Sequence, residues 1–179
     1  MQEWNAVISV NERGYRKALD VFGDFGEVTR TEFFNVLLLR AENVPEMLED
    51  LRERALQRPE SLSFLARLIP VTRAFIFNSA EEFESKSKEL VLKWASQLAG
   101  KSFYVRVLRR GFKGRLSSPE EERSLDTMLL EVLDKNGTPG RIVFENPDAV
   151  IVIETIGTWA GLSLWTQEDL EKYPFIRVR

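Results

Sequence analysis

Histidine and cysteine are both absent from the 179 residues of this chain. Their absence excludes disulfides, thiolate nucleophiles, imidazole bases and metal sites with cysteine or histidine ligands. Any catalysis has to rely on Asp, Glu, Lys, Ser, Thr or Tyr, and any metal site on oxygen ligands. The range of possible reactions is therefore narrow, and we expect no catalytic residues, no metal and no cofactor.

Long apolar runs are missing as well. The apolar stretches are short, such as Val150 to Ile153, whereas a membrane-spanning helix needs roughly 18 apolar residues or more. The chain does not open with a basic and then apolar leader. With 44% apolar and 30% charged residues, the composition is typical of a globular protein with one large domain or two small ones. We expect a cytoplasmic protein that does not associate with membranes.

The first 70 residues predict a strand, a helix, two short strands and a second helix. Residues 5–10 have the apolar character of a strand, and Asn11 after them is expected to cap the first helix. Asn43 is expected to cap the second helix, because a proline and a glutamate follow at the positions typical of a helix start. This order of elements is typical of a ferredoxin-like α+β domain.

Pro70 separates the two halves of the chain, since proline fits neither a central strand nor the interior of a helix. We expect a ferredoxin-like domain over residues 1–70 and a second domain over residues 71–179. In the second domain, Ser79 and Ser118 are expected to cap two amphipathic helices. The strands expected there are residues 103–110, 141–144, 149–153 and 159–165, with a possible edge strand at 176–179.

Basic residues are concentrated in one segment. Residues 101–116 contain six basic side chains and no acidic one, which leaves 19 basic against 28 acidic residues in the rest of the chain. The net charge of −3 therefore divides into +6 on this segment and −9 on the remainder. Salt screens charges beyond about 8 Å, so a local basic segment can bind a polyanion even on an acidic protein. The six candidate RNA-binding residues are Lys101, Arg106, Arg109, Arg110, Lys113 and Arg115.

Alternation along the expected strand places Tyr104, Arg106 and Arg110 on one face, opposite the core residues. A glycine-bracketed loop that carries Lys113 follows. Because the planar guanidinium of arginine suits phosphate oxygens, this strand end and loop form a candidate phosphate-binding surface. Two alternatives stay open: the charged run is a solvated face, and Phe112 within it packs in the core instead of stacking on a base.

Acidic residues offer little catalytic chemistry. The run Glu120 to Glu122 is interpreted as the acidic start of a helix and not as a metal site, because consecutive helical residues point in different directions. Asp148 and Glu154 are the only carboxylates that qualify as catalytic candidates, and turn and hairpin roles explain them more simply.

Two segments carry a resemblance to a known family. One is the strand and basic loop from Phe103 to Gly114, and the other runs from Phe144 to Glu154, where a Pro-Asp turn leads into an apolar strand. Together with the helix between them they resemble the THUMP domain, an RNA-binding module of thiouridine synthetases, RNA methyltransferases and some pseudouridine synthases. The resemblance spans Val71 to Thr166, and the preceding domain resembles the ferredoxin-like domain that commonly accompanies THUMP. It implies an α+β protein whose second domain is a THUMP-like α/β domain with a mixed sheet.

The resemblance also implies a function. THUMP proteins recognise the acceptor stem and 3′ end of tRNA, and the basic residues named above match the family's basic strand and loop. The chain has no glycine-rich cofactor loop and no cysteine for sulfur transfer. It therefore resembles stand-alone members of the family, such as the adaptor that presents tRNA to a cytidine acetyltransferase.

We expect a non-enzymatic tRNA-binding adaptor for tRNA modification and processing, which works with an RNA-modifying enzyme in trans. On this hypothesis, reversing Arg109 and Arg110 to glutamate abolishes tRNA binding and leaves the melting temperature nearly unchanged. The alternative, favoured by the acidic remainder, is an assembly subunit that docks a basic partner protein and binds RNA weakly or not at all.

Overall fold

The computed structural model describes residues 3–179, which divide into two compact units. The first unit comprises the chain up to Thr72 together with Leu170–Arg177 and Arg179, and the second comprises Arg73–Asp169 and Val178. The division lies two residues after Pro70, where the sequence analysis placed the domain boundary. Residues Leu170–Arg177, however, belong to the first unit, whereas the expected second domain included them.

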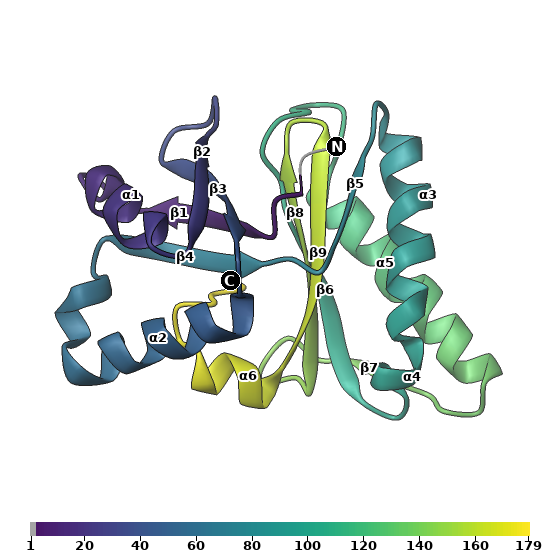
Figure 1. Cartoon of the computed structure of the whole chain (residues 1–179). Helices are drawn as coiled ribbons and strands as arrows, with labels where there is room; N and C mark the ends of the chain where they lie inside the picture. Colours follow the sequence, from purple (N-terminus) through teal and green to yellow (C-terminus); the bar gives the residue numbers. More distant parts are fainter. Residues whose placement is uncertain (1–2) are drawn as a thin grey trace. The chain divides into compact units, whose positions relative to one another are not determined.

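The first unit has the element order β-α-β-β-α-β (Figure 1). Its four strands are antiparallel in the order β2-β3-β1-β4, which is a ferredoxin-like arrangement and confirms the expected α+β class. The elements are β1 (Ala6–Val10), α1 (Tyr15–Gly23), β2 (Gly26–Arg30), β3 (Val36–Ala41), α2 (Val44–Gln57), the short 3-10 helix η1 (Pro59–Leu62) and β4 (Leu65–Pro70).

The two asparagines expected to cap helices behave differently. The side chain of Asn43 accepts a hydrogen bond from the backbone N–H of Glu46 at 3.0 Å, so the cap expected for α2 is confirmed. The cap expected at Asn11 is wrong: Gly14 precedes α1, and the Asn11 amide donates to the carbonyl of Ser63 at 2.7 Å instead. A Cβ at Gly14 would lie 2.6 Å from the carbonyl oxygen of Phe64, so this close approach requires glycine.

The second unit is built on a five-stranded mixed sheet in the order β5-β9-β8-β6-β7. Strand β6 runs parallel to β7 and β8, whereas β9 is antiparallel to β8 and β5, which confirms the mixed sheet expected for this domain. Figure 1 shows α3 and α5 on one side of this sheet. The elements are β5 (Arg73–Ile76), α3 (Ala80–Val91), η2 (Leu92–Trp94), α4 (Ala95–Leu98), β6 (Ser102–Leu108), α5 (Ser118–Lys135), β7 (Arg141–Ile142), β8 (Ala149–Ile156) and β9 (Trp159–Thr166). The last helix, α6 (Gln167–Lys172), begins in the second unit and ends in the first.

The core of the second unit lies between this sheet and its helices. Phe103, Val105 and Val107 of β6 belong to it, as the alternation in the sequence predicts. The hairpin expected at Gly157 is also confirmed, because β8 and β9 pair up to Ile156 and Trp159 and Gly157 adopts a φ of 60°.

The cap of α5 lies one residue earlier than the sequence pattern predicts. The Ser117 hydroxyl, and not that of Ser118, accepts a hydrogen bond from the backbone N–H of Glu120 at 3.4 Å. Ser117 has the extended backbone typical of a cap, whereas Ser118 is already helical. Two serines in succession made the two registers look alike in the sequence.

The C-terminal residues form no strand, so the edge strand considered at 176–179 is wrong. They nevertheless lie along β4: the carbonyl of Phe175 accepts from the Leu68 N–H at 3.1 Å, and the Arg177 guanidinium donates to the Leu65 carbonyl at 3.2 Å. An irregular segment that uses one side chain thus covers an otherwise open sheet edge. Within residues 3–179, no helix combines the length and apolar character needed to cross a membrane.

Candidate RNA-binding surface

Helix α5 holds the strand that leads to the basic loop. Strand β7 pairs only with Ser102 and Phe103, so the later N–H groups on that side of β6 face no strand. Side chains of α5 accept their hydrogen bonds: Asp126 from the Val105 N–H at 2.9 Å, and Glu122 from the Val107 N–H at 2.7 Å. Glu122 and Asp126 are four residues apart in the helix, which corresponds to a rise of about 6 Å. The two N–H groups are two residues apart in the strand, or about 6.6 Å, so the spacing of the carboxylates matches that of the N–H groups.

The chain leaves the sheet at a fixed point. The backbone N–H of Arg110 donates to the Thr155 carbonyl at 3.1 Å, and the N–H of Gly157 donates to the Arg110 carbonyl at 2.8 Å. Positive φ angles at Gly111 and Gly114 then turn the backbone sharply. These bonds fix the start of the basic loop to the β8–β9 hairpin.

Phe112 is partly buried, packs against the core of the second unit and also supports the loop. Its φ of 52° is uncommon for a bulky residue and costs about 1 kcal/mol or more. The ring compensates by packing against Phe77, with 4.9 Å between centroids. The Arg115 guanidinium lies over the Phe112 ring, 4.4 Å from its centroid. The phenyl ring therefore supports an arginine, and the question whether it packs or stacks on a base is decided in favour of packing.

Three of the six candidate side chains gather at this loop. Lys113 and Arg115 are exposed, and Arg109 is half-buried with its guanidinium donating to the Gly111 carbonyl. Arg115 also donates to the Asn78 carbonyl at 3.4 Å. We call Arg109, Lys113 and Arg115 the strand-exit surface.

Two other candidates form ion pairs with carboxylates. The guanidinium of Arg110, whose side chain is 19% exposed, donates to Glu154, which is 0% exposed. Arg106 lies 3.7 Å from Glu122 and over the Tyr104 ring at 5.3 Å. Both arginines therefore have structural roles in the sheet.

Lys101 lies at the opposite end of β6, in the turn that precedes Ser102. At about 3.3 Å per strand residue, its backbone is more than 20 Å from that of Arg109. The structure thus brings together three of the six predicted residues, pairs two with acids, and places one at a distance.

Two acidic side chains of α5 point inward, which the interpretation as a helix start did not predict. Burial raises the pKa of Glu121 to about 7, and it also raises the pKa of Asp126 to about 7. Both residues lie close to the apolar stripe of the helix. Glu121 lies one turn before Leu125, and Asp126 lies one turn before Leu129. Helical periodicity was therefore the signal that could have identified them.

The two carboxylates considered for catalysis have structural partners. Asp148 accepts a hydrogen bond from the Ser102 N–H at 2.9 Å, and its own N–H donates to the Ser102 hydroxyl. Hydrogen bonds from the backbone and the side chain of Ser102 to the carboxylate lower the pKa of Asp148 below its ordinary value. Glu154 pairs with Arg110. Across the described residues no group of three acidic side chains is arranged to bind a metal ion.

No protein-family model and no curated protein matches this sequence. Solved structures, however, share its fold. PH1313 from Pyrococcus horikoshii Ot3 superimposes over 90% of the chain with a TM-score of 0.61 and 12% identity. TrmN from Thermus thermophilus matches 90% of the chain with a TM-score of 0.58 and 17% identity. A 4-thiouridine synthetase, solved with RNA and bound ATP, matches 92% with a TM-score of 0.51 and 15% identity.

The likeness covers both units, and it supports the expected α+β class with a mixed sheet in the second unit. The match accounts for 54%, 44% and 42% of those three chains, so this chain spans about half of their length or less. At these identities the comparison concerns the fold.

Proposed function

We propose that this protein binds tRNA through the strand-exit surface. The observation that carries the proposal is the placement of Arg109, Lys113 and Arg115 on one short loop. Among the described residues, none of the three forms an ion pair with a carboxylate, whereas Arg106 and Arg110 do. Their charges therefore remain available for phosphate oxygens.

The loop suits recognition of a nucleic-acid backbone. Its path is fixed by the bonds at Arg110, and Arg115 rests on a ring that is itself packed. Pre-positioned guanidinium and ammonium groups bind phosphates with a smaller loss of side-chain entropy. Double-stranded RNA is read mainly through its shape and backbone, so such a surface needs no base-specific contacts.

The fold likeness to a 4-thiouridine synthetase solved with RNA supports the choice of RNA as the partner. We further propose that the acceptor stem and 3′ end of tRNA are recognised, and that the protein is a non-enzymatic adaptor for a modifying enzyme. The absence of histidine and cysteine and the structural partners of Asp148 and Glu154 support a role without catalysis.

The test is a tRNA-binding titration with the double variant Lys113→Glu and Arg115→Glu. We expect at least a tenfold loss of affinity, because two phosphate contacts are replaced by repulsion. Lys135→Glu is the matched control, since it reverses a charge at the far end of the 18-residue helix α5, about 27 Å along its axis. Equal affinity of the double variant and the control would exclude this surface.

Salt and tRNA truncation test the finer proposal. If three to six phosphates are neutralised, the logarithm of the affinity should fall with the logarithm of salt concentration with a slope of about −2 to −5. Removal of the 3′ end should weaken binding of the wild-type protein. If the truncated tRNA binds with unchanged affinity, recognition of the 3′ end is rejected, whereas the proposal of RNA binding is not affected.

The charge of −9 outside the basic segment favours a second candidate, an assembly subunit that docks a basic protein. Purification of the protein from cells distinguishes the two. Co-purifying RNA that nuclease removes supports the tRNA adaptor, and a stoichiometric protein that remains after nuclease treatment supports the assembly subunit.

A further inference from the structure

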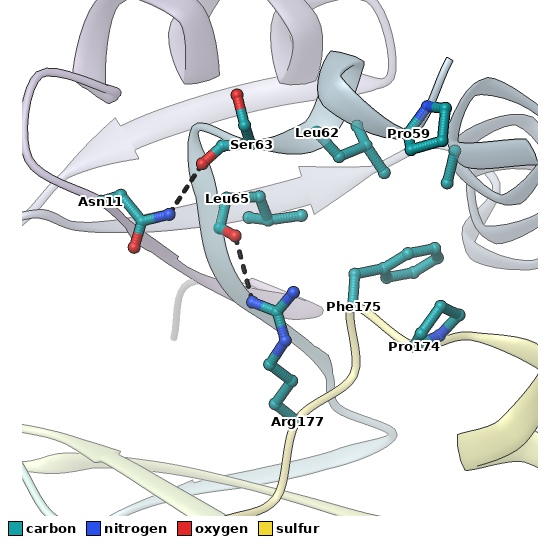
Figure 2. A pocket seen from close by; sticks show the side chains of 9 residues that line it. Asn11, Pro59, Leu62, Ser63, Leu65, Pro174, Phe175 and Arg177 are labelled. Carbon is teal, nitrogen blue, oxygen red and sulfur yellow. Dashed lines mark hydrogen bonds between the residues drawn. The ribbon is translucent and has the colours of Figure 1, made fainter. Parts of the chain in front are cut away.

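The first unit contains a pocket of about 340 Å³ that is separate from the strand-exit surface (Figure 2). The end of α2, the 3-10 helix η1, the start of β4 and the C-terminal segment all contribute to its wall. Pockets that bind small molecules begin at about 300 Å³. The volume is therefore sufficient for a ligand of one or two rings.

The lining of the pocket is segregated into an apolar and a polar part. Figure 2 shows Pro59, Leu62, Pro174 and Phe175 gathered on one side of the pocket. Leu62 and Phe175 are almost completely buried, so they form a fixed apolar wall. Proline and phenylalanine rings present flat surfaces, which suit a flat apolar group.

Arg177 supplies a positive charge at the polar part. One terminal nitrogen of its guanidinium donates to the Leu65 carbonyl at 3.2 Å and also to the Ala66 carbonyl. The other terminal nitrogen lies on the side that faces Phe175 (Figure 2), and it has no hydrogen-bond partner within residues 3–179. None of the lining residues is acidic, so no carboxylate in the wall neutralises this charge.

Asn11 lies beside the polar part as a fixed group. Its amide nitrogen donates to the Ser63 carbonyl at 2.7 Å, which leaves the amide oxygen as an acceptor. The pocket thus combines a positive donor, a neutral acceptor and a flat apolar wall. A ligand that satisfies all three has an apolar ring, a single anionic group and a hydrogen-bond donor such as a ring N–H.

We propose that this pocket binds a small amphipathic anion, in which a flat apolar body rests on the Phe175 wall and a carboxylate or phosphate binds Arg177. An arginine already fixed by backbone carbonyls loses little side-chain entropy when it binds an anion. The proposal concerns the first unit alone and is independent of tRNA binding through the strand-exit surface.

Titration monitored by two-dimensional amide NMR tests the proposal with two anionic probes, indole-3-acetate and adenosine 5′-monophosphate. Their neutral counterparts, tryptophol and adenosine, are the matched ligands. We expect at least one anion to shift the amides around Phe175 and Arg177, with an affinity at least tenfold above that of its neutral counterpart. A preference for one probe identifies the anionic group as carboxylate or phosphate.

Two variants separate the charge from the cavity. Arg177→Gln should reduce the affinity for the anion at least tenfold, whereas Arg179→Gln, two residues later, should leave it unchanged. Ala55→Phe fills the pocket from α2 while Arg177 is kept, and it should also abolish binding. A dispersed amide spectrum of each variant verifies folding.

The proposal is overturned if neither anion binds, if the neutral compounds bind equally well, or if both variants bind like the wild type. Lys113→Glu provides an independent reference, because it should weaken tRNA binding and leave the anion affinity unchanged. The two binding activities are therefore tested separately. Absence of anion binding contradicts only this proposal, and absence of tRNA binding contradicts only the proposed function.

Discussion

At the scale of single residues, equal charges in the sequence have unequal environments in the structure. Arg109 and Arg110 are neighbours in one basic run, yet only Arg110 is paired with a completely buried carboxylate. The expectation that both could be reversed without changing the melting temperature is therefore incompatible with the ion pair to Glu154. Arg110 is unsuitable as a probe of RNA binding, because its replacement affects the fold first.

Replacing Arg110 with glutamine should destabilise the protein by about 3–5 kcal/mol, since the substitution removes the guanidinium that pairs with a completely buried carboxylate. Unfolding in urea, followed by circular dichroism, measures this difference. Arg109→Gln is the control and should change the stability by less than about 0.5 kcal/mol. Equal midpoints for the two variants would show that the pair with Glu154 contributes little.

At the scale of elements, α5 takes the place of a neighbouring strand along part of β6. Asp126 and Glu122 accept the N–H groups that β7 is too short to reach. This arrangement holds β6 between a parallel strand and a helix, and it fixes the direction in which the basic loop leaves the sheet. A charged helix start in the sequence thus includes side chains that complete the hydrogen bonding of a sheet.

Burial of Asp126 makes stability depend on pH. The pKa of this carboxyl is about 7 in the folded protein, against about 3.9 in an unfolded chain. The folded state binds the proton more tightly, so the stabilisation is complete below about pH 4 and is lost as the pH rises through about 7.

Asp126→Asn should therefore reduce the difference in unfolding free energy between pH 5 and pH 8 by about 1–3 kcal/mol. The asparagine side chain can still accept a hydrogen bond from the Val105 N–H, and it does not titrate between these pH values. Urea unfolding at both pH values measures the effect, and Asp134→Asn, an exposed position on the same helix, is the control. If both variants retain the wild-type pH dependence, Asp126 is ionised in the folded state at either pH.

At the scale of the whole molecule, the two units are not two consecutive pieces of sequence. The chain builds the first sheet, then the complete second sheet, and its end belongs again to the first unit. Two contacts attach the C-terminal segment to the first unit. Phe175 is 3% exposed, and the Tyr173 hydroxyl donates a hydrogen bond to Glu49. The C-terminal segment also covers the open edge of β4 and forms one side of the proposed anion pocket.

Phe175→Ala should selectively destabilise the first unit. Removal of a buried phenyl ring costs about 3–5 kcal/mol through lost burial and the cavity that remains. Amide hydrogen exchange is the measurement: protection of the Leu68 N–H, which donates to the Phe175 carbonyl, should fall by a factor of 100 or more. Amides of β8 in the second unit serve as the internal reference, and a parallel loss there would contradict a local effect.

Local sequence patterns were sufficient to predict the features that depend on neighbouring residues. Apolar alternation predicted the core side of β6, the Asn43 and Ser79 patterns predicted the starts of two helices, and Gly157 predicted the hairpin. The order of elements and the resemblance predicted the α+β class and the mixed sheet. Charge counting located the basic segment, because a local excess of arginine and lysine is visible without any coordinates.

Which of those basic side chains form ion pairs depends on contacts between distant parts of the chain. Arg110 meets Glu154 across 44 residues of chain, Arg106 meets Glu122 of the following helix, and Arg177 reaches the carbonyls of β4. Such pairings depend on which strands are neighbours and where the free edges lie, and no local pattern encodes them. For the same reason the C-terminal segment differed from expectation. The strand-exit surface thus contains the predicted residues that lie together on one loop and form no ion pair with a carboxylate, whereas Arg106 and Arg110 are paired within the sheet and Lys101 lies at the other end of β6.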